Sequence, residues 1–161
     1  MTQEFVIDER LVDLHLPATD RDGALRHLCR LLAEGGLADD SYAGAVLERE
    51  ASYPTGLQFE GIAIGLPHAG SDHVLKSGIA LGRTDTTVSF RRMDDPGVEI
   101  PVDLIVLLSL KDPERHVEIL AELIGFLASA ESAQRVRSAA SAAELVALFR
   151  AGLGSFAGGD Q

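Results

Sequence analysis

The stretch from Val102 to Leu110, VDLIVLLSL, constrains the fold more than any other part of the chain. Its aliphatic residues follow one another with little polar alternation, as in a β-strand that is buried on both faces. A strand of this kind lies inside a sheet that other elements cover on both sides. The stretch is too short to cross a bilayer and it contains Asp103, so we interpret it as a core strand.

Several segments carry apolar residues at helical spacing, and most of them begin at a residue that can cap a helix. They lie at residues 20–34, 41–53, 112–127, 132–138 and 141–149. In the first of them, Cys29 is expected in the core and His27 in solvent. The third begins at Asp112-Pro113, a strong helix start, and its expected core-facing stripe includes Val117. These helices are the layers that can cover the sheet.

Other segments have the pattern of β-strands. They lie at Leu11–Leu16, Ile62–Leu66, Ile79–Leu81 and Thr86–Arg91. The turn residues Asp94-Asp95-Pro96-Gly97 form a short link before the buried strand, which predicts an antiparallel pair there. We therefore expect an α/β fold with a mixed β-sheet flanked by helices on both faces.

The length and charge of the chain limit its organisation and its partners. A chain of 161 residues predicts a single domain, here over residues 1–150, with a flexible Gly-rich tail at 151–161. The net charge of −11 argues against nucleic acid or an anionic membrane as partner, because both require basic patches. Cys29 is the only cysteine, which excludes an internal disulfide. No signal segment is visible, so we expect a cytoplasmic protein that does not insert into the membrane.

His68 lies in a setting that favours chemistry. It follows the predicted strand 62–66, between Pro67 and the small pair Ala69-Gly70. Pro67 fixes the backbone before the imidazole, and Gly70 removes side-chain bulk after it. A bulky group or another protein can therefore approach the ring closely. Neutral imidazole is a competent nucleophile near neutral pH, because its unperturbed pKa is about 6.5.

Signatures of several other sites are absent from the sequence. We find no P-loop, no dinucleotide-binding glycine motif after a strand and no serine nucleophile elbow. His68, Asp72 and His73 are residue types that bind metals, but their spacing is not that of a helix-borne pair. No cysteine or glutamate cluster completes such a site. We therefore expect neither a metal nor a cofactor.

Arg49 and His116 are the residues that can assist His68 if its electrophile is a phosphoryl group, whose charged oxygens need donors. Arg49, in the last turn of the second helix, can supply a bidentate fork, although its spacing alone favours a capping or surface charge. His116, near the start of the third helix, can supply an imidazole N–H in the positive field of the helix end. Spacing alone leaves open whether the three converge.

A set of motifs in this order resembles one protein family. They are LERE with Arg49, YPTG at residues 53–56, IGLPHAG with His68, and DPERH ending at His116. The set resembles the fructose, mannitol and galactitol class (type 2) of enzyme IIA, a component of the bacterial sugar phosphotransferase system. The resemblance covers roughly Leu11 to Phe149, and the YPTG turn looks most like the galactitol-type branch.

The resemblance implies a mannitol-type enzyme IIA fold and a phosphotransferase that acts as a phosphocarrier. His68 would accept a phosphoryl group from the histidine phosphocarrier HPr and pass it to a IIB component, which serves the sugar-binding IIC component in the membrane. Arg49 matches the family's phosphate-neighbouring arginine. His116 matches the second active-site histidine of the mannitol and fructose members.

Two alternatives remain open at this point. The domain can be a regulatory IIA protein, like those of the nitrogen-related system, whose phosphorylation state is read by a target. It can also be a non-catalytic interaction module, which distant positions of Arg49 and His116 would favour. For docking of a partner, Leu57, Phe59 and Leu66 are expected to form an apolar rim around His68. The sugar and the oligomeric state are not encoded in any motif.

Overall fold

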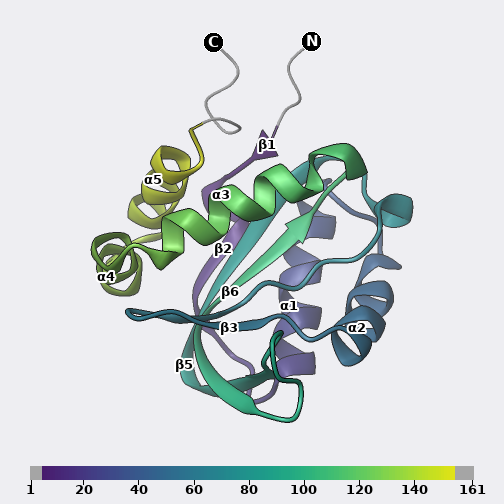
Figure 1. Cartoon of the computed structure of the whole chain (residues 1–161). Coiled ribbons are helices and arrows are strands. Elements are labelled where there is room, and N and C mark those ends of the chain that lie inside the picture. The colour runs from purple at the N-terminus through teal and green to yellow at the C-terminus, as the bar shows by residue number, and fades with distance from the viewer. Residues whose placement is uncertain (1–4, 155–161) are drawn as a thin grey trace.

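The computed structural model describes residues 5–154 and consists of one sheet between layers of helices (Figure 1). The helices are α1 (Arg21–Glu34), α2 (Tyr42–Ser52), α3 (His116–Ala128), α4 (Ala130–Ser138) and α5 (Ala142–Gly152). Short 3-10 helices lie at η1 (Glu9–Leu11), η2 (Ser71–His73) and η3 (Pro113–Arg115). The strands are β1 (Phe5–Val6), β2 (Val12–Leu16), β3 (Gly56–Gln58), β4 (Ala63–Gly65), β5 (Ser77–Arg91) and β6 (Glu99–Ser109).

The sheet is mixed, with the strand order β1-β5-β6-β4-β3 and with β2 also paired to β5. The two long strands β5 and β6 are antiparallel and are joined by the turn that contains Asp94–Gly97. β4 pairs parallel with β6 and antiparallel with β3, whereas β1 and β2 run parallel to β5. The predicted mixed sheet and its antiparallel pair are therefore confirmed.

β6 separates two clusters of buried apolar side chains. Leu104, Val106 and Leu108 belong to the cluster that α3, α4 and α5 cover. Ile105 and Leu107 belong to the other cluster, with the buried residues of α1 and α2. In Figure 1, α3 crosses in front of the sheet and α1 lies behind it. The expected strand buried on both faces, and the helices on both sides of it, are confirmed.

β5 differs from the prediction of two separate strands at Ile79–Leu81 and Thr86–Arg91. It is a single strand whose register against β6 shifts between Arg83, opposite Leu104, and Val88, opposite Val102. The extra residues in β5 form an irregularity in the ladder, and main-chain pairing with β6 continues before and after it. The polar run from Arg83 to Thr86 interrupts the apolar pattern, and this interruption made the strand look like two.

Two side chains lie in environments that the sequence did not predict. Val117 is 77% exposed, because the buried stripe of α3 runs through Ile119, Leu123 and Leu127 instead. Val117 lies about a third of a turn away from the centre of that stripe. His27 is not free in solvent, since its Nε2 lies 2.8 Å from Asp13 Oδ2 and the pair is partly buried.

The ordered C-terminal part extends beyond the expected boundary at residue 151. α5 continues to Gly152, and Leu153 is fully buried in the core. The segment 151–161 predicted as a tail therefore overlaps the end of α5, and its residues 155–161 lie outside the described residues.

Substitution by alanine is expected to change the free energy of unfolding in opposite directions at Gly65 and Gly44. A Cβ at Gly65, the last residue of β4, would lie 2.5 Å from the ring of Phe90, whereas a Cβ at the exposed Gly44 of α2 meets nothing within 4 Å. Gly65→Ala is expected to lower the free energy of unfolding by about 1–3 kcal/mol through overpacking. Gly44→Ala is expected to raise it by about 0.5–1 kcal/mol, since alanine favours the helix. Urea unfolding of both variants tests this, and a neutral Gly65→Ala would contradict it.

Candidate active site

His68 lies where β4 ends, on a loop that is held against the core. Its side chain is nearly buried, and the residue is 7% exposed. The ring Nδ1 lies 3.0 Å from the carbonyl oxygen of Leu66, so Nδ1 carries the hydrogen and donates it. Among the described side chains, Nε2 finds no hydrogen-bond partner, and no fully buried polar side-chain atom lacks one. Nε2 therefore reaches the surface with its lone pair free.

The pKa of His68 is lowered from 6.5 to about 4, chiefly because burial disfavours the charged ring. The bond to the Leu66 carbonyl raises the pKa, and the nearby His116 and Arg49 lower it further. The imidazole is thus neutral near pH 7, the state in which it can act as a nucleophile.

This shift makes the stability of the protein depend on pH. The unfolded chain binds a proton at His68 near pH 6.5, but the folded protein binds it only near pH 4. The contribution of the neutral His68 ring to the free energy of unfolding is therefore fully present above pH 6.5. It is lost as the pH falls towards 4, by up to about 3 kcal/mol. Urea unfolding over this interval should show a steeper loss for the wild type than for His68→Gln. Equal pH dependence of the two proteins would contradict the assignment.

His116 is the first residue of α3 and contacts His68. The centroids of the two rings are 4.7 Å apart, and the rings meet edge to face at 76°. The pKa of His116 is lowered by burial and by the charge of Arg49. Asp112 caps the preceding turn η3 by accepting a hydrogen bond from the N–H of Glu114. The predicted helix start at Asp112-Pro113 thus carries His116 to the ring of His68.

Arg49 lies in the last turn of α2, as the sequence predicted. Its guanidinium carbon is 5.1 Å from the centroid of the Tyr53 ring, a cation–π arrangement that holds the side chain in place. In the described part of the chain it forms no ion pair with a carboxylate. Its charge lowers the pKa of both His68 and His116. The three residues are therefore within electrostatic range, and Arg49 has donors available for an anion.

The His68 loop is anchored by residues that the sequence did not single out for the site. The carbonyl of Pro67 accepts from Leu108 N–H of β6 at 3.0 Å. The buried Tyr42 hydroxyl donates to Leu108 O at 2.6 Å and accepts from Ala69 N–H at 3.2 Å. On the other side, the hydroxyl of Thr55 accepts from Leu66 N–H at 3.0 Å. In the sequence, Tyr42 is only one of the residues of the predicted helix at 41–53, and Thr55 is only part of the YPTG turn.

The remaining histidines are paired with aspartates away from the ring of His68. His73 Nδ1 lies 3.2 Å from Asp39 Oδ2, and His15 Nδ1 lies 3.0 Å from Asp85 Oδ1. Within residues 5–154, no group of three metal-ligating side chains is found.

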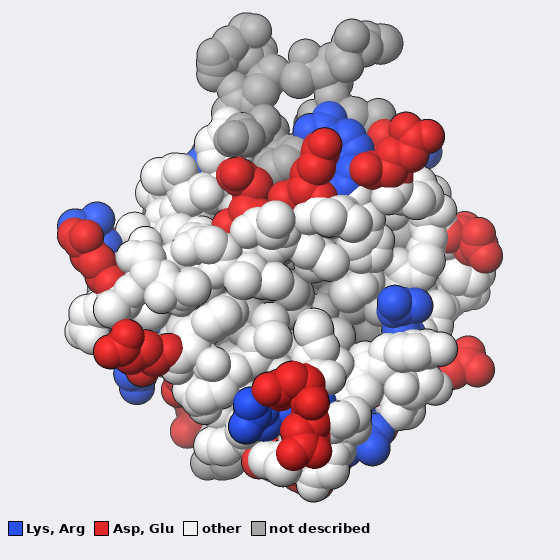
Figure 2. Space-filling model, viewed as in Figure 1, with Lys and Arg blue, Asp and Glu red and all other residues white. Residues whose placement is uncertain are grey.

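The expected docking rim needs a correction. Leu66 is 1% exposed and is part of the core, so it cannot contact a partner. Leu57 and Phe59 are partly buried against the same cluster. The exposed apolar side chains next to the site residues are instead Tyr53, 65% exposed, and Val117. In the view of Figure 2, most charged side chains lie towards the edge, and a largely uncharged area lies at the centre of this face.

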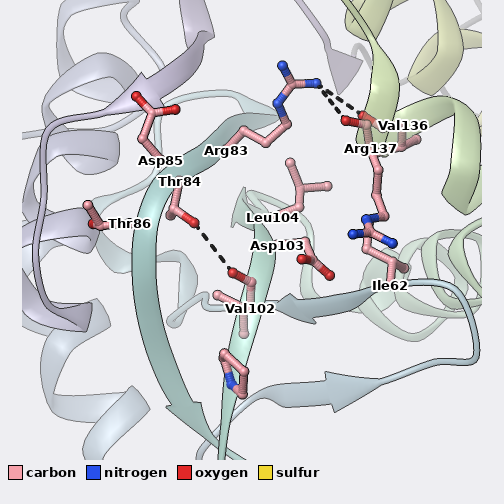
Figure 3. A pocket seen from close by; sticks show the side chains of 11 residues that line it. Ile62, Arg83, Thr84, Asp85, Thr86, Val102, Asp103, Leu104, Val136 and Arg137 are labelled. Atoms are coloured by element: carbon pink, nitrogen blue, oxygen red, sulfur yellow. Dashed lines mark hydrogen bonds between the residues drawn. The ribbon is translucent and has the colours of Figure 1, made fainter.

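A separate cavity of about 310 Å³ lies between β5, β6 and α4 (Figure 3). Arg83, which lines it, donates through Nη1 to the carbonyls of Val136, Arg137 and Ala139 at the end of α4. Asp103, on the same wall, accepts from the N–H of Ala63 at 2.9 Å. These polar groups hold α4 and β4 in place, and none of the three predicted site residues lines this cavity.

Residues 5–152 match the family described as phosphoenolpyruvate-dependent sugar phosphotransferase system, EIIA 2. The chain is 32% identical over 108 residues to the galactitol-specific EIIA component of Escherichia coli K12, covering 67% of this chain and 71% of that protein. It is 34% identical over 115 residues to the fructose-specific EIIA component of Haloferax volcanii, covering 70% and 71%.

The fold also has a solved counterpart. The structure of the complex of mannitol enzyme IIA with phosphorylated enzyme IIB from Escherichia coli matches with a TM-score of 0.76 and 24% identity, covering 91% of this chain and 99% of that one. At this identity the similarity shows the fold, and the predicted mannitol-type fold is confirmed. No helix among the described residues is long and apolar enough to span a membrane. By its family match and its relatives, the chain belongs to the EIIA 2 family of the phosphoenolpyruvate-dependent sugar phosphotransferase system.

Proposed function

We propose that this domain is a phosphocarrier that accepts a phosphoryl group from phospho-HPr on Nε2 of His68. One observation carries the proposal: the ring is neutral, its Nδ1–H is bound to the Leu66 carbonyl, and its Nε2 is free at the surface. A ring held in this way presents one nucleophilic lone pair in a fixed direction.

The reaction is an in-line displacement at phosphorus. The lone pair of His68 Nε2 attacks while the phosphorus–nitrogen bond of phospho-HPr breaks, and the electrons of that bond return to the HPr histidine. The new phosphohistidine keeps its hydrogen on Nδ1, so the ring carries a positive charge that the Leu66 carbonyl stabilises. The same charge makes the ring a good leaving group for the next transfer.

Arg49 and His116 serve the transferring oxygens in this proposal. The guanidinium of Arg49, without a carboxylate partner among the described residues, can donate two parallel hydrogen bonds. His116, in edge contact with His68, can donate from its own ring at the start of α3. Donors set in place before the reaction stabilise the charge that develops on the oxygens.

The phosphoryl group then passes to a IIB component for sugar uptake and phosphorylation. The similar mannitol enzyme IIA forms a complex with phosphorylated enzyme IIB. Exposed Tyr53 next to Arg49 and exposed Val117 next to His116 offer apolar contacts on both sides of the site. Exposed apolar contacts of this kind suit a protein partner even though the chain as a whole is acidic.

The test is incubation of the purified protein with phosphoenolpyruvate, enzyme I and HPr, followed by intact mass measurement. We expect a gain of one phosphoryl group that is lost in acid. Addition of a IIB component should then remove the group, which supports the transport role. A phosphorylated protein that transfers to no IIB component would support the regulatory role instead, and no gain with an active HPr would support the non-catalytic module.

A further inference from the structure

A chain of hydrogen bonds links a buried carboxylate of α2 to the ring of His68. Glu50 is 1% exposed and Thr55 is 4% exposed. Oε2 of Glu50 accepts from Thr55 N–H at 2.8 Å, and Oε1 accepts from the Thr55 hydroxyl at 2.7 Å. The same hydroxyl oxygen accepts from Leu66 N–H at 3.0 Å. Leu66 in turn offers its carbonyl to His68 Nδ1.

The direction of these bonds is set by Glu50. A hydroxyl has one hydrogen, and in Thr55 that hydrogen is donated to the Glu50 carboxylate. The oxygen of Thr55 is therefore left as an acceptor, which is what the Leu66 N–H requires. Without this acceptor a buried N–H would have no partner, and the backbone of Leu66 would have to rotate to find one.

We propose that Glu50 and Thr55 are positioning residues that fix the Leu66 backbone and thereby the tautomer and orientation of His68. Neither touches the ring. They act through the Leu66 carbonyl, which selects the form of His68 with the hydrogen on Nδ1 and the lone pair on Nε2. The effect on transfer rate rests on the function proposed above, but the effect on the tautomer does not.

The turn at Thr55 does not depend on these bonds for its existence. Gly56, the next residue, pairs with Gly65 in the β3–β4 ladder, and its carbonyl accepts from Met93 N–H at 2.9 Å. The turn is thus held at its far end by main-chain bonds that leave out the side chains of Glu50 and Thr55. Removing the Thr55 hydroxyl should loosen Leu66 while the strands stay paired.

The decisive comparison is Thr55→Val against Thr55→Ser. Valine keeps the shape of threonine and lacks the hydroxyl, whereas serine keeps the hydroxyl. The readout is the pair of ¹⁵N chemical shifts of the His68 ring near pH 7, assigned by their loss in His68→Gln. In the wild type and in Thr55→Ser, Nδ1 should have the shift of a protonated nitrogen and Nε2 that of an unprotonated one. In Thr55→Val the two shifts should move towards each other, as in a mixture of tautomers.

Thr84→Val is the matched control, because the Thr84 hydroxyl bonds to the Val102 carbonyl on β6, in the wall of the separate cavity. It should leave the His68 shifts unchanged. With phospho-HPr as donor, Thr55→Val should accept the phosphoryl group about 10- to 100-fold more slowly, as expected for a misplaced nucleophile. Thr55→Ser should restore most of the rate.

Each result of these experiments either supports or contradicts the positioning role of Glu50 and Thr55. Unchanged His68 shifts in a folded Thr55→Val protein would overturn the proposal. Should Thr55→Val fail to fold, Glu50→Gln gives a second test, because its amide puts an NH2 donor in place of one of the two oxygens that accept separately from the N–H and the hydroxyl of Thr55. Wild-type shifts in Glu50→Gln would likewise overturn it. If Thr55→Val shifts the tautomer of His68 but the wild-type protein never accepts a phosphoryl group, the positioning role stands and only the proposed function is wrong.

Discussion

Replacement of His68 by glutamine is expected to abolish phosphorylation by phospho-HPr, with no phosphorylated species detectable by intact mass. His68 offers the one free ring nitrogen at the site that is both unprotonated near pH 7 and fixed by a bond on its other nitrogen. Glutamine has a similar length and polarity, and the loop on either side of residue 68 is held by the bonds of Pro67 and Ala69, so the loop should keep its conformation. Glutamine has no nitrogen lone pair that can attack phosphorus.

His73→Gln is the matched control for this experiment, because His73 lies five residues further along the same segment and is paired with Asp39 at the surface. It should be phosphorylated to the same extent as the wild type. Circular dichroism of both variants should match that of the wild type. Phosphorylation of His68→Gln would mean that another residue accepts the group, and it would end the assignment of His68.

Replacement of Arg49 by glutamine is expected to slow phosphoryl transfer to His68 by about 10²–10³-fold, the usual effect of removing one donor from a developing anion. The guanidinium is held over the Tyr53 ring and forms no ion pair within residues 5–154, so its donors are free for the transferring group. Arg49→Lys should recover part of the rate, because it restores the charge without the two-pronged geometry. Rapid-quench measurement of the transfer from phospho-HPr gives these rates.

Arg26→Gln, at an exposed position of α1, serves as the control for a change in net charge. Its rate of transfer should stay within about twofold of the wild type, since distant surface charges are screened by salt. If Arg49→Gln and Arg26→Gln slowed transfer equally, the effect of Arg49 would be one of overall charge, and Arg49 would not belong to the site.

The architecture could be predicted from the sequence because its strongest signals are local. The aliphatic run at 102–110 identified β6, and the apolar spacing with capping residues identified the helices. The β5–β6 pairing followed from the turn at Asp94–Gly97. The register shift of β5 between Arg83 and Val88 could not be predicted, because it depends on how β5 aligns with the residues of β6. Strands as short as β1 and β3 carry too few residues for a periodic pattern.

The site could be predicted only in part, for a similar reason. His68 was found from its own neighbours in the sequence, whereas its contact with His116 joins segments far apart in the chain and needed the resemblance to a family. Glu50 was missed because a glutamate in a helix next to Arg49 looks like a solvent-exposed charge. Only its partner Thr55, five residues later across a turn, makes it a buried acceptor. Val117 was assigned to the core because the phase of the α3 stripe depends on which face the sheet presents.

The strand order also determines how this domain can meet other chains. The two longest strands, β5 and β6, pair with each other, and on their outer sides β5 pairs with β1 and β2 as far as Thr84 and β6 pairs with β4 at Leu104 and Ile105. In the described part of the chain, the outer positions are held by β3 and by β1 and β2, which are three, two and five residues long. Short edges offer little template for edge-to-edge pairing, so the domain is protected against aggregation through its sheet. Its associations should therefore form through side chains around the strand ends, and they should be readily reversible, as the proposed carrier role requires.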